Sequence, residues 1–427
     1  MHKLIKIIGT VAVINIVARL LGFLREVAIG YKYGTSTMAD AIAVAYTIPN
    51  FIYLVVGGAL TTAFISVYHS SDSDKNYFVR KAFTSVLVTV LTIVVLIILL
   101  TDPILHVFFS ELNPDNNRIV RNLFLWMMPS TIFLVLSTWM SGLLNLNGLF
   151  TLSSVAILIY NLLFVLIGFT FTSVFGPLSY GIGAFVAAVV MGGFLYVGLR
   201  KSQPYSFKPL FTKSPDVIRM WRIALPILLG GASLQFYFII HRIVAAGLEP
   251  GVISSVNYAS KLTGFPQAIM MTAVTTVIYP LLSKKEGEGD DKTIRSLYRK
   301  GMVYLVSLLV PVTVIAYIFA EPLVTLVFGY GNFTQESIDQ TVPIFKVFAL
   351  SMFFLASNTY ITRFYYAKGN SVIPVLFSII NVFVVNLIVI YSLLGSFGAS
   401  AIAYGTVFSS ASNFVMLFIY AKMKWRL

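Results

Sequence analysis

The chain has 427 residues, of which 58% are hydrophobic and only 11% are charged, and its mean hydropathy is +0.87. A soluble fold of this length cannot bury so much apolar surface, because even a large domain needs a polar exterior. The composition therefore excludes a soluble enzyme, a disordered protein and a nucleic-acid-binding domain, although the formal net charge is +14. Cys is absent, which excludes disulfides, thiolate nucleophiles and Cys-ligated metals. The sequence predicts an integral membrane protein.

Twelve segments are long and apolar enough to cross a bilayer as helices, because about 20 residues at a rise of about 1.5 Å span a hydrocarbon core of roughly 30 Å. The longest polar connection separates six spans from six, which predicts an N-lobe at 1–200, a cytoplasmic linker at 201–216 and a C-lobe at 217–427. Ser214 followed by Pro215 is a helix-start signal for the seventh span. The predicted spans lie at about 7–30, 38–67, 80–101, 119–145, 152–174, 178–200, 217–246, 254–283, 297–319, 337–366, 371–394 and 397–421.

The two halves share sequence marks at a nearly constant offset, which is typical of an internal duplication. Because each half has six spans, both halves begin on the same side of the membrane and form parallel repeats. The predicted fold is thus an all-α polytopic membrane protein with two six-helix lobes around a central cavity. The alternative is that helical membrane proteins share Pro and Gly by chance. The paired marks are Pro49 with Pro266, Asp102-Pro103 with Glu321-Pro322, Thr138-Trp139 and Gly148 with Thr359-Tyr360 and Gly369, Asn161 with Asn381, and Gly176 with Gly398.

The basic residues predict the orientation of the chain. Of the 30 Lys and Arg residues, 22 fall on the N-terminal side of the predicted membrane and four on the opposite side. Cytoplasmic loops carry an excess of Lys and Arg, so both termini are predicted to be cytoplasmic. The remaining four, Arg19, Arg25, Arg242 and Lys261, lie inside predicted spans.

These intramembrane cations are the candidate functional residues. A cation near the bilayer centre costs at least about 2.5 kcal/mol, so it normally faces a wet cavity or a partner. Helical rise places Arg19, Arg25 and Lys261 at depths where they can converge. Three converging cations predict an anionic substrate, and Arg suits bidentate recognition of phosphate. The alternatives are snorkelling to the interface and pairing with Glu26 or Asp40.

Other residues of the spans refine this prediction. Gly22 is expected to let the first helix bend, so that both of its arginines reach one space. Arg242, next to His241 near the outer end of its span, is interpreted as an interfacial anchor. The only acids near the apolar zone are Glu26 and Asp40, which disfavours a drug/cation antiporter, because such proteins carry deep acids.

Motifs for other chemistry are absent from the sequence. It has no phosphate-binding Gly-rich loop, and its four His are too scattered to ligate a metal. The outer segment after the third span carries Asp102, Glu111 and Asp115, which are interpreted as solvated loop acids rather than a glycosyltransferase site. The charged run at 284–292 is expected to be a flexible loop.

Six short sequence motifs resemble those of a known protein family. They are Ala18-Arg19-Leu20-Leu21-Gly22-Phe23-Leu24-Arg25-Glu26, Ala39-Asp40-Ala41, Ile48-Pro49-Asn50, Gly58-Ala59-Leu60, Tyr258-Ala259-Ser260-Lys261 with Phe265-Pro266, and Phe328-Gly329-Tyr330-Gly331-Asn332-Phe333-Thr334. Together they resemble the MurJ (MviN) lipid II flippases, a family of the multidrug/oligosaccharidyl-lipid/polysaccharide (MOP) exporter superfamily. The block from the first two spans is the most specific part of this resemblance.

The resemblance implies an alternating-access flippase in the bacterial plasma membrane. Such a protein moves an undecaprenyl-pyrophosphate-linked sugar, with lipid II as the first candidate, from the inner to the outer leaflet. By the same resemblance, Arg19, Arg25 and Lys261 (usually Arg in the family) bind the pyrophosphate. Positioning or gating falls to Asp40, Glu26, Gly22 and Pro49.

The sequence departs from the family pattern at several positions. An arginine of the family's second span corresponds to about Tyr53, and a glutamate of its Glu-Gly-Ala motif corresponds to Gly57. The acids that coordinate sodium in some members correspond to His241 and Val385, so sodium coupling is not expected, no cofactor is expected, and the membrane potential remains as an energy source. The sequence shows twelve spans, whereas lipid II flippases typically have two more, which weakens lipid II as the particular cargo.

Four alternatives remain open at this stage: a flippase for another lipid-linked oligosaccharide of capsule or teichoic type, a drug/cation antiporter, a polyprenol-dependent glycosyltransferase and a non-transporting scaffold. The expected partners are the lipid-linked glycan, the lipid bilayer and cell-wall synthesis proteins, with no nucleic acid. The protein is expected to be a monomer.

Overall fold

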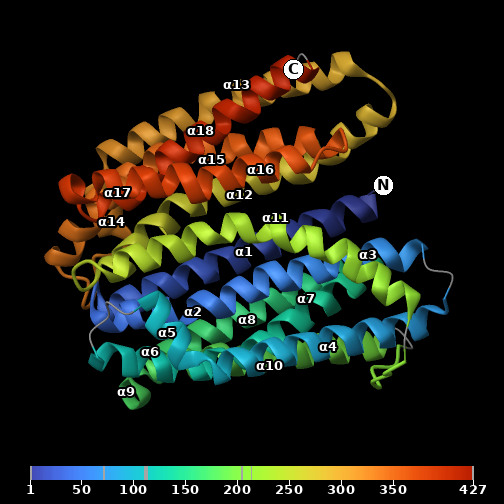
Figure 1. The fold of residues 1–427 in the computed structure, drawn as a ribbon, viewed down its shortest axis with the longest axis horizontal. Coiled ribbons are helices and arrows are strands. Elements are labelled where there is room, and N and C mark those ends of the chain that lie inside the picture. The colour runs from blue at the N-terminus through green and yellow to red at the C-terminus, as the bar shows by residue number, and fades with distance from the viewer. Residues whose placement is uncertain (1, 71–72, 110–113, 203–204, 213, 426–427) are drawn as a thin grey trace. The chain divides into compact units, whose positions relative to one another are not determined.

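The computed structural model describes residues 2–70, 73–109, 114–202, 205–212 and 214–425 (Figure 1). Within these ranges every regular element is a helix, which confirms the predicted all-α fold. The elements are α1 (His2–Tyr33), α2 (Thr37–Ile52), η1 (Tyr53–Gly57), α3 (Gly58–Ser70), α4 (Lys75–Leu99), α5 (Thr101–Phe109), α6 (Pro114–Met127), α7 (Ser130–Leu146), α8 (Phe150–Thr170), α9 (Thr172–Phe175), α10 (Leu178–Ser202), α11 (Pro215–Ala246), α12 (Val252–Gly287), α13 (Asp291–Ile318), α14 (Ala320–Phe328), α15 (Gln335–Ala367), α16 (Val372–Ile380), η2 (Asn381–Val385), α17 (Asn386–Phe397) and α18 (Ser400–Trp425).

The long helices correspond in order to the twelve predicted spans. Nine helices or continuous helical runs of the described chain are long and apolar enough to cross a membrane, and the two segments of α11 make a tenth when they count as one span. The other two long helices are α1 and α12, with 32 and 36 residues, and they carry Arg19, Arg25 and Lys261. Pro215 begins α11, as the helix-start signal predicts.

The chain forms two compact units. One contains Met1–Lys32 and Thr37–Gln235, and the other contains Tyr33–Ser36 and Phe236–Leu427. The chain therefore passes from one unit to the other within α11 and on both sides of the short connection between α1 and α2. The lobe boundaries drawn from the sequence, with a linker at 201–216, stay a prediction.

Each unit repeats the same order of helix packing (Figure 1). In the first unit, α10 packs on α8 and α7, α4 packs on α7, and α2 and α3 pack on α6 and α7. In the second unit, α18 packs on α17 and α15, α13 packs on α15, and α12 packs on α15. The sixth span of each half thus covers the fifth and the fourth, while the second and third spans flank the fourth. This repeated packing confirms the duplication predicted from paired sequence marks.

Two of the paired marks also share their local conformation. Gly148 follows α7 with a φ of +75°, and Gly369 follows α15 with a φ of +70°. Gly176 and Gly398 end α9 and α17 with φ values of +56° and +49°. Only glycine adopts this left-handed region without steric cost, so these residues end corresponding helices in the two halves.

Buried aromatic residues fill the same place in each core. In the first unit Trp139 lies 5.0 Å from Phe64, measured between ring centroids. In the second unit Tyr360, the repeat partner of Trp139, lies 5.1 Å from Phe364, which in turn lies 5.2 Å from Tyr298. Such large rings bury much apolar surface, and this packing joins α3 to α7 in the first unit and α13 to α15 in the second.

The segment predicted as an outer loop after the third span is a short helix, α5, and that prediction is wrong. Its first turn holds Asp102, which pairs with Arg121 at 2.7 Å in an exposed ion pair. Glu111 lies outside the described residues. The corresponding helix of the second half, α14, has the same length of nine residues and carries Glu321 in its first turn.

The charged run at 284–292 is also ordered, contrary to the prediction of a flexible loop. Helix α12 continues to Gly287 and α13 begins at Asp291, so only a tight turn separates them. Asp290 caps α13 by accepting a hydrogen bond from the Thr293 backbone N–H at 3.1 Å. Hydrogen bonds from Thr293 hold the pKa of the Asp290 carboxyl below its usual value.

The described part of the linker packs on the first unit. The hydroxyls of Tyr205 and Tyr68 are 2.7 Å apart, and the Leu210 N–H donates to Thr84 Oγ1 at 2.9 Å. The ring of Phe207 lies 5.4 Å from that of Phe83. These contacts fasten the linker to α3 and α4.

Candidate functional site

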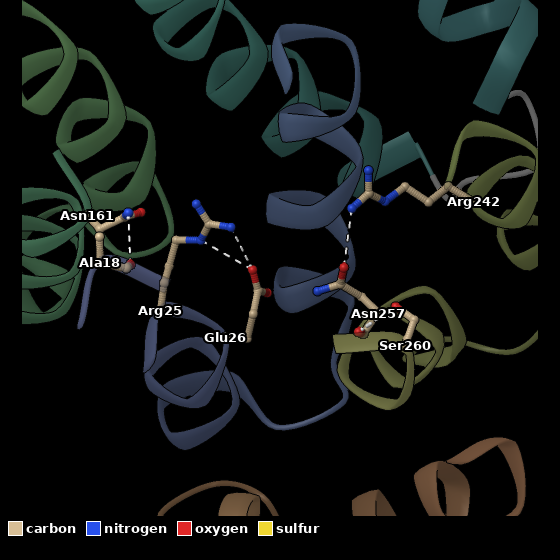
Figure 2. Close-up of polar contacts among 7 residues, drawn as sticks. All are labelled: Ala18, Arg25, Glu26, Asn161, Arg242, Asn257 and Ser260. Atoms are coloured by element: carbon tan, nitrogen blue, oxygen red, sulfur yellow. Dashed lines mark hydrogen bonds and ion pairs between the residues drawn. The ribbon is translucent and has the colours of Figure 1, made fainter. Parts of the chain in front are cut away.

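Arg25 lies on α1 in the interior of the first unit, where it is only 9% exposed. Its Nε and Nη2 donate to Glu26 Oε1 at 3.2 and 2.8 Å (Figure 2). The planar guanidinium also lies 4.7 Å from the ring centroid of Tyr46 and 4.9 Å from that of Phe164. A buried cation needs such partners, because its removal from water costs several kcal/mol. The ion pair and the two aromatic rings offset this cost. The alternative of pairing with Glu26 is therefore what the structure shows.

The partners of Arg25 join three helices of the first unit. Tyr46 belongs to α2 and Phe164 to α8, and their ring centroids are 6.0 Å apart. Asn161 of α8 donates from Nδ2 to the Ala18 carbonyl at 3.1 Å (Figure 2). A Cβ built on Gly22 would lie 3.4 Å from Asn161 Oδ1. Helix α1 runs through Gly22 without interruption, so this glycine marks the close approach of α1 to α8.

Arg19 lies on the same helix in a different environment. It is exposed, whereas Arg25 is buried. At about 100° per residue, the two side chains leave α1 in directions separated by about 120°. Whether the two guanidinium groups reach one space, as the sequence predicts, stays a prediction.

Two of the four predicted positioning or gating residues, Asp40 and Pro49, lie on α2, and the other two lie on α1. Asp40 is 3% exposed and lies in the first turn, where a carboxylate interacts favourably with the helix dipole. Pro49 is buried inside the helix and cannot donate a backbone hydrogen bond. The next segment, Tyr53–Gly57, is a π-helical turn, a feature that occurs frequently at functional sites. This irregular turn begins and ends at the two positions where the sequence departs from the family motif.

Lys261 lies on α12 in the second unit and is half-buried. Its Nζ lies 5.5 Å from the ring centroid of Phe238 on α11. One turn earlier on α12, Asn257 Oδ1 accepts a hydrogen bond from Arg242 Nη2 at 3.3 Å (Figure 2). Ser260 donates to the Asn257 carbonyl at 2.9 Å. Arg242 thus connects α11 with α12 beside the candidate lysine.

The positions that correspond to sodium-ligating acids hold other groups here. His241 is 5% exposed, and its Nε2 lies 3.2 Å from Thr406 Oγ1. Val385 is the last residue of the π-helical turn η2. Nearby, Tyr237 donates to Ser409 Oγ at 2.9 Å. Among the described residues no three His, Asp or Glu side chains are grouped as metal ligands.

Reasoning from the sequence missed the aromatic partners of Arg25 because Tyr46 and Phe164 lie on helices far from it in the chain. The signal that could have found them is chemical, since a buried guanidinium prefers aromatic faces. The convergence of Arg19 and Arg25 with Lys261, which joins residues of the two units, stays a prediction.

Comparisons with known proteins show what the chain as a whole is similar to. A family model described as "Lipid II flippase MurJ" matches residues 29–427. The probable lipid II flippase MurJ of Buchnera aphidicola subsp. Schizaphis graminum is 26% identical over 431 residues, which cover 97% of this chain and 83% of that protein.

Two solved structures share the fold. A lipid II flippase MurJ in the inward closed conformation matches with a TM-score of 0.84 at 21% identity, over 96% of this chain and 87% of that chain. An inward-facing multidrug resistance MATE family transporter of the MOP superfamily matches with a TM-score of 0.82 at 14% identity, over 97% and 98%. These likenesses confirm the predicted fold of two six-helix lobes.

Proposed function

This chain belongs to the lipid II flippase family MurJ, and from that premise we propose that it moves lipid II from the inner to the outer leaflet. It is a multi-pass protein of the bacterial inner membrane and a transporter rather than an enzyme. Its cargo is therefore a lipid-linked molecule of the bilayer.

The observation that carries the proposed role in binding is the exposed Arg19 in the spanning helix α1. A cation in hydrocarbon costs at least about 2.5 kcal/mol, so a guanidinium that is exposed at this depth is accommodated best where water or an anion can reach it. The pyrophosphate of a lipid-linked sugar supplies that anion, and the guanidinium fork matches phosphate oxygens in pairs. Lys261, half-buried on α12, supplies a second cation.

Arg25 takes part in a different way. Its guanidinium is paired with Glu26 at 2.8 Å, so it binds pyrophosphate only by exchanging that carboxylate for a phosphate oxygen. The exchange keeps the buried cation paired, and the displaced Glu26 carboxylate then has to reach water or take up a proton. Asp40, at the start of α2, and Pro49, before the π-helical turn, act in positioning and gating.

The distribution of Lys and Arg supports an orientation with both termini in the cytoplasm. The lobes then expose the site first to the inside and next to the outside, while the lipid tail stays in the bilayer. The membrane potential is the proposed energy source, since each charge that crosses is worth about 2.3 kcal/mol per 100 mV. Sodium is not needed for this cycle.

A second candidate is a flippase for another lipid-linked oligosaccharide, of capsule or teichoic type. The observation that favours it is the departure from the family motif at Tyr53 and Gly57, the two ends of the π-helical turn. The pyrophosphate chemistry of Arg19 and Lys261 is the same for either cargo.

Flipping of defined substrates by the purified protein in proteoliposomes tests the proposal. We expect lipid II to be flipped and the Arg19→Glu variant to be inactive. The same variant is expected to fail to rescue a strain depleted of its lipid II flippase. Rescue by Arg19→Glu at normal expression would contradict the role of Arg19. Flipping of a capsule-type lipid but not of lipid II would favour the second candidate.

Two further expectations concern assembly. We propose a monomer, which light scattering of the purified protein tests directly. Association with cell-wall synthesis proteins is the remaining proposal, and crosslinking in intact cells tests it.

A further inference from the structure

The last residue of α1 and its connection to α2, together residues 33–36, belong to the second unit, although the rest of α1 and all of α2 belong to the first. The described chain thus enters the second unit for four residues and then leaves it again. A segment this short is expected to follow its own helices unless specific contacts hold it elsewhere. The structure supplies such contacts.

Hydrogen bonds fix the segment to α12 and α15. The Thr35 N–H donates to Ser337 Oγ at 3.2 Å, and Thr35 Oγ1 donates to the same oxygen at 2.9 Å. From the other side, the Tyr258 hydroxyl donates to the Gly34 carbonyl at 3.0 Å. The backbone of the segment is therefore held on both sides by side chains of the second unit.

The residues beneath the segment form a rigid aromatic cluster. Tyr258 is 1% exposed, and its ring centroid lies 5.0 Å from Phe328 and 5.7 Å from Phe333. Phe328 and Phe333 stack at 5.5 Å. These two residues are the first and the second-to-last of the sequence motif 328–334. This motif takes no part in the proposed transport site. We infer that the role of this motif is to hold the Tyr258 ring, so that its hydroxyl reaches the Gly34 carbonyl.

Two glycines allow the segment to lie against the unit's backbone. Gly34 has a φ of +55°, and a Cβ on it would collide with the Asn332 carbonyl oxygen. Gly251 has a φ of +88°, and a Cβ on it would collide with the Thr35 carbonyl oxygen. Side chains at either position are excluded both by conformation and by space. The close fit of residues 33–36 against the second unit is therefore specific to the position that they occupy here.

We propose that residues 33–36 form a latch, which is seated in the second unit when the outer end of the transporter is closed and which leaves its seat before the sugar is released outside. The proposal uses the orientation with cytoplasmic termini, which places the end of α1 on the outer side. Four residues extend to about 14 Å at most, so α1 and α2 cannot move far from the seat while the latch is engaged. Tyr258 and Ser337 are positioning residues that set the balance between the two states.

The absence of Cys from the chain makes a disulfide test direct. In a Thr35→Cys/Ser337→Cys variant, oxidation should form a disulfide, because the native hydroxyl oxygens are 2.9 Å apart. We expect oxidation to reduce the flipping rate at least tenfold and reduction to restore it. The matched control is Thr172→Cys/Ser179→Cys, whose hydroxyls are 3.4 Å apart within the first unit, and its oxidation should leave flipping unchanged.

A second measurement does not depend on any substrate. Spin labels at Phe175→Cys and Tyr330→Cys, both exposed and one in each unit, report the separation of the outer ends. Ser337→Ala removes the hydroxyl that bonds Thr35, so the ratio of open to closed molecules should rise about fivefold, which corresponds to about 1 kcal/mol. Tyr258→Phe should act in the same direction.

Three results would overturn the latch. The first is undiminished flipping by the oxidised Thr35→Cys/Ser337→Cys variant, which would show that the segment stays seated throughout the cycle. The second is failure of this pair to crosslink under conditions that crosslink the control pair. The third is an unchanged distance distribution in both Ser337→Ala and Tyr258→Phe, which would refute the latch even in a protein whose cargo differs from the one proposed.

Discussion

Arg25 on α1 and Lys261 on α12 are cations of spanning helices, yet their surroundings differ in kind. Arg25 is buried, paired with Glu26 and stacked on the rings of Tyr46 and Phe164. Lys261 is half-buried, and its Nζ lies 5.5 Å from the ring centroid of Phe238. A charge inside a membrane span can therefore serve either to hold helices together or to receive a ligand. The first unit contains both kinds on one helix, because Arg19 is exposed while Arg25 is enclosed.

The largest effect on transport is expected from Arg19. Replacing it by Glu puts an anion where the pyrophosphate has to bind, so flipping of a pyrophosphate-linked lipid should be lost. Thermal stability should change little, because exposed substitutions usually stay within about 0.5 kcal/mol. Parallel flipping and melting assays check this, with Arg19→Lys as the control that keeps the charge. A large loss of stability in Arg19→Glu would mean that Arg19, like Arg25, holds the fold together, which would contradict the distinction between the two residues.

The largest effect on stability is expected from Glu26→Gln. It leaves Arg25 buried without its carboxylate, and breaking a buried pair costs about 3–5 kcal/mol. The double variant Arg25→Met/Glu26→Leu removes both charges and should recover most of that loss. Unfolding of the purified protein in detergent, followed by temperature or denaturant, measures the difference. If Glu26→Gln were as stable as the native chain, the pair would not be a structural element.

A smaller effect on transport is expected at Lys261. Lys261→Met removes one charged hydrogen-bond donor, and such bonds contribute about 1.5–3 kcal/mol, so the flipping rate should fall about tenfold or more. Lys261→Arg should retain activity, because the guanidinium still reaches phosphate. The matched control is Lys284→Met, an exposed cation at the end of α12. Equal loss in Lys261→Met and Lys284→Met would mean that only overall charge matters.

The smallest effect is expected from a charge outside the membrane. Asp290→Asn should leave flipping unchanged, since this residue only caps α13 and pairs with Lys285 outside the spans. Thr293 lowers the pKa of the Asp290 carboxyl, so the stabilisation by the cap is present above the unfolded value of 3.8 and is lost as the pH falls through the lower folded value. The protection factors of the amides in the first turn of α13, which are exchange rates corrected for the intrinsic rate at each pH, should be lower at pH 3 than at pH 7. Pronounced loss of transport in Asp290→Asn would contradict this separation of roles.

Much of the fold follows from the sequence because its signals are local or periodic. Twelve apolar segments, a helix start at Pro215 and paired marks such as Gly148 with Gly369 each depend on nearby residues. The short helix α5 was missed because an acid and a proline at its start indicate a loop as readily as a first turn. The ordered turn after α12 was missed because a run of charges does not reveal which of them cap a helix.

The candidate site was predicted only in part. Apolar surroundings single out Arg19, Arg25 and Lys261, because cations there are costly. Whether such a cation is enclosed depends on helices distant in the chain, as with Tyr46 and Phe164 around Arg25. The π-helical turn at Tyr53–Gly57 lies in a continuous helical run, and no composition signal in these residues distinguishes it from a regular α-helical turn.

The central claim is that exposed cations of the spans recognise a pyrophosphate. The most direct measurement compares flipping rates in proteoliposomes for one sugar linked to the same polyprenol through a pyrophosphate or through a single phosphate. The native chain should flip the pyrophosphate lipid faster, and Arg19→Gln should abolish that preference. Equal rates for the two lipids in the native chain, or a preference that survives in Arg19→Gln, would contradict the account.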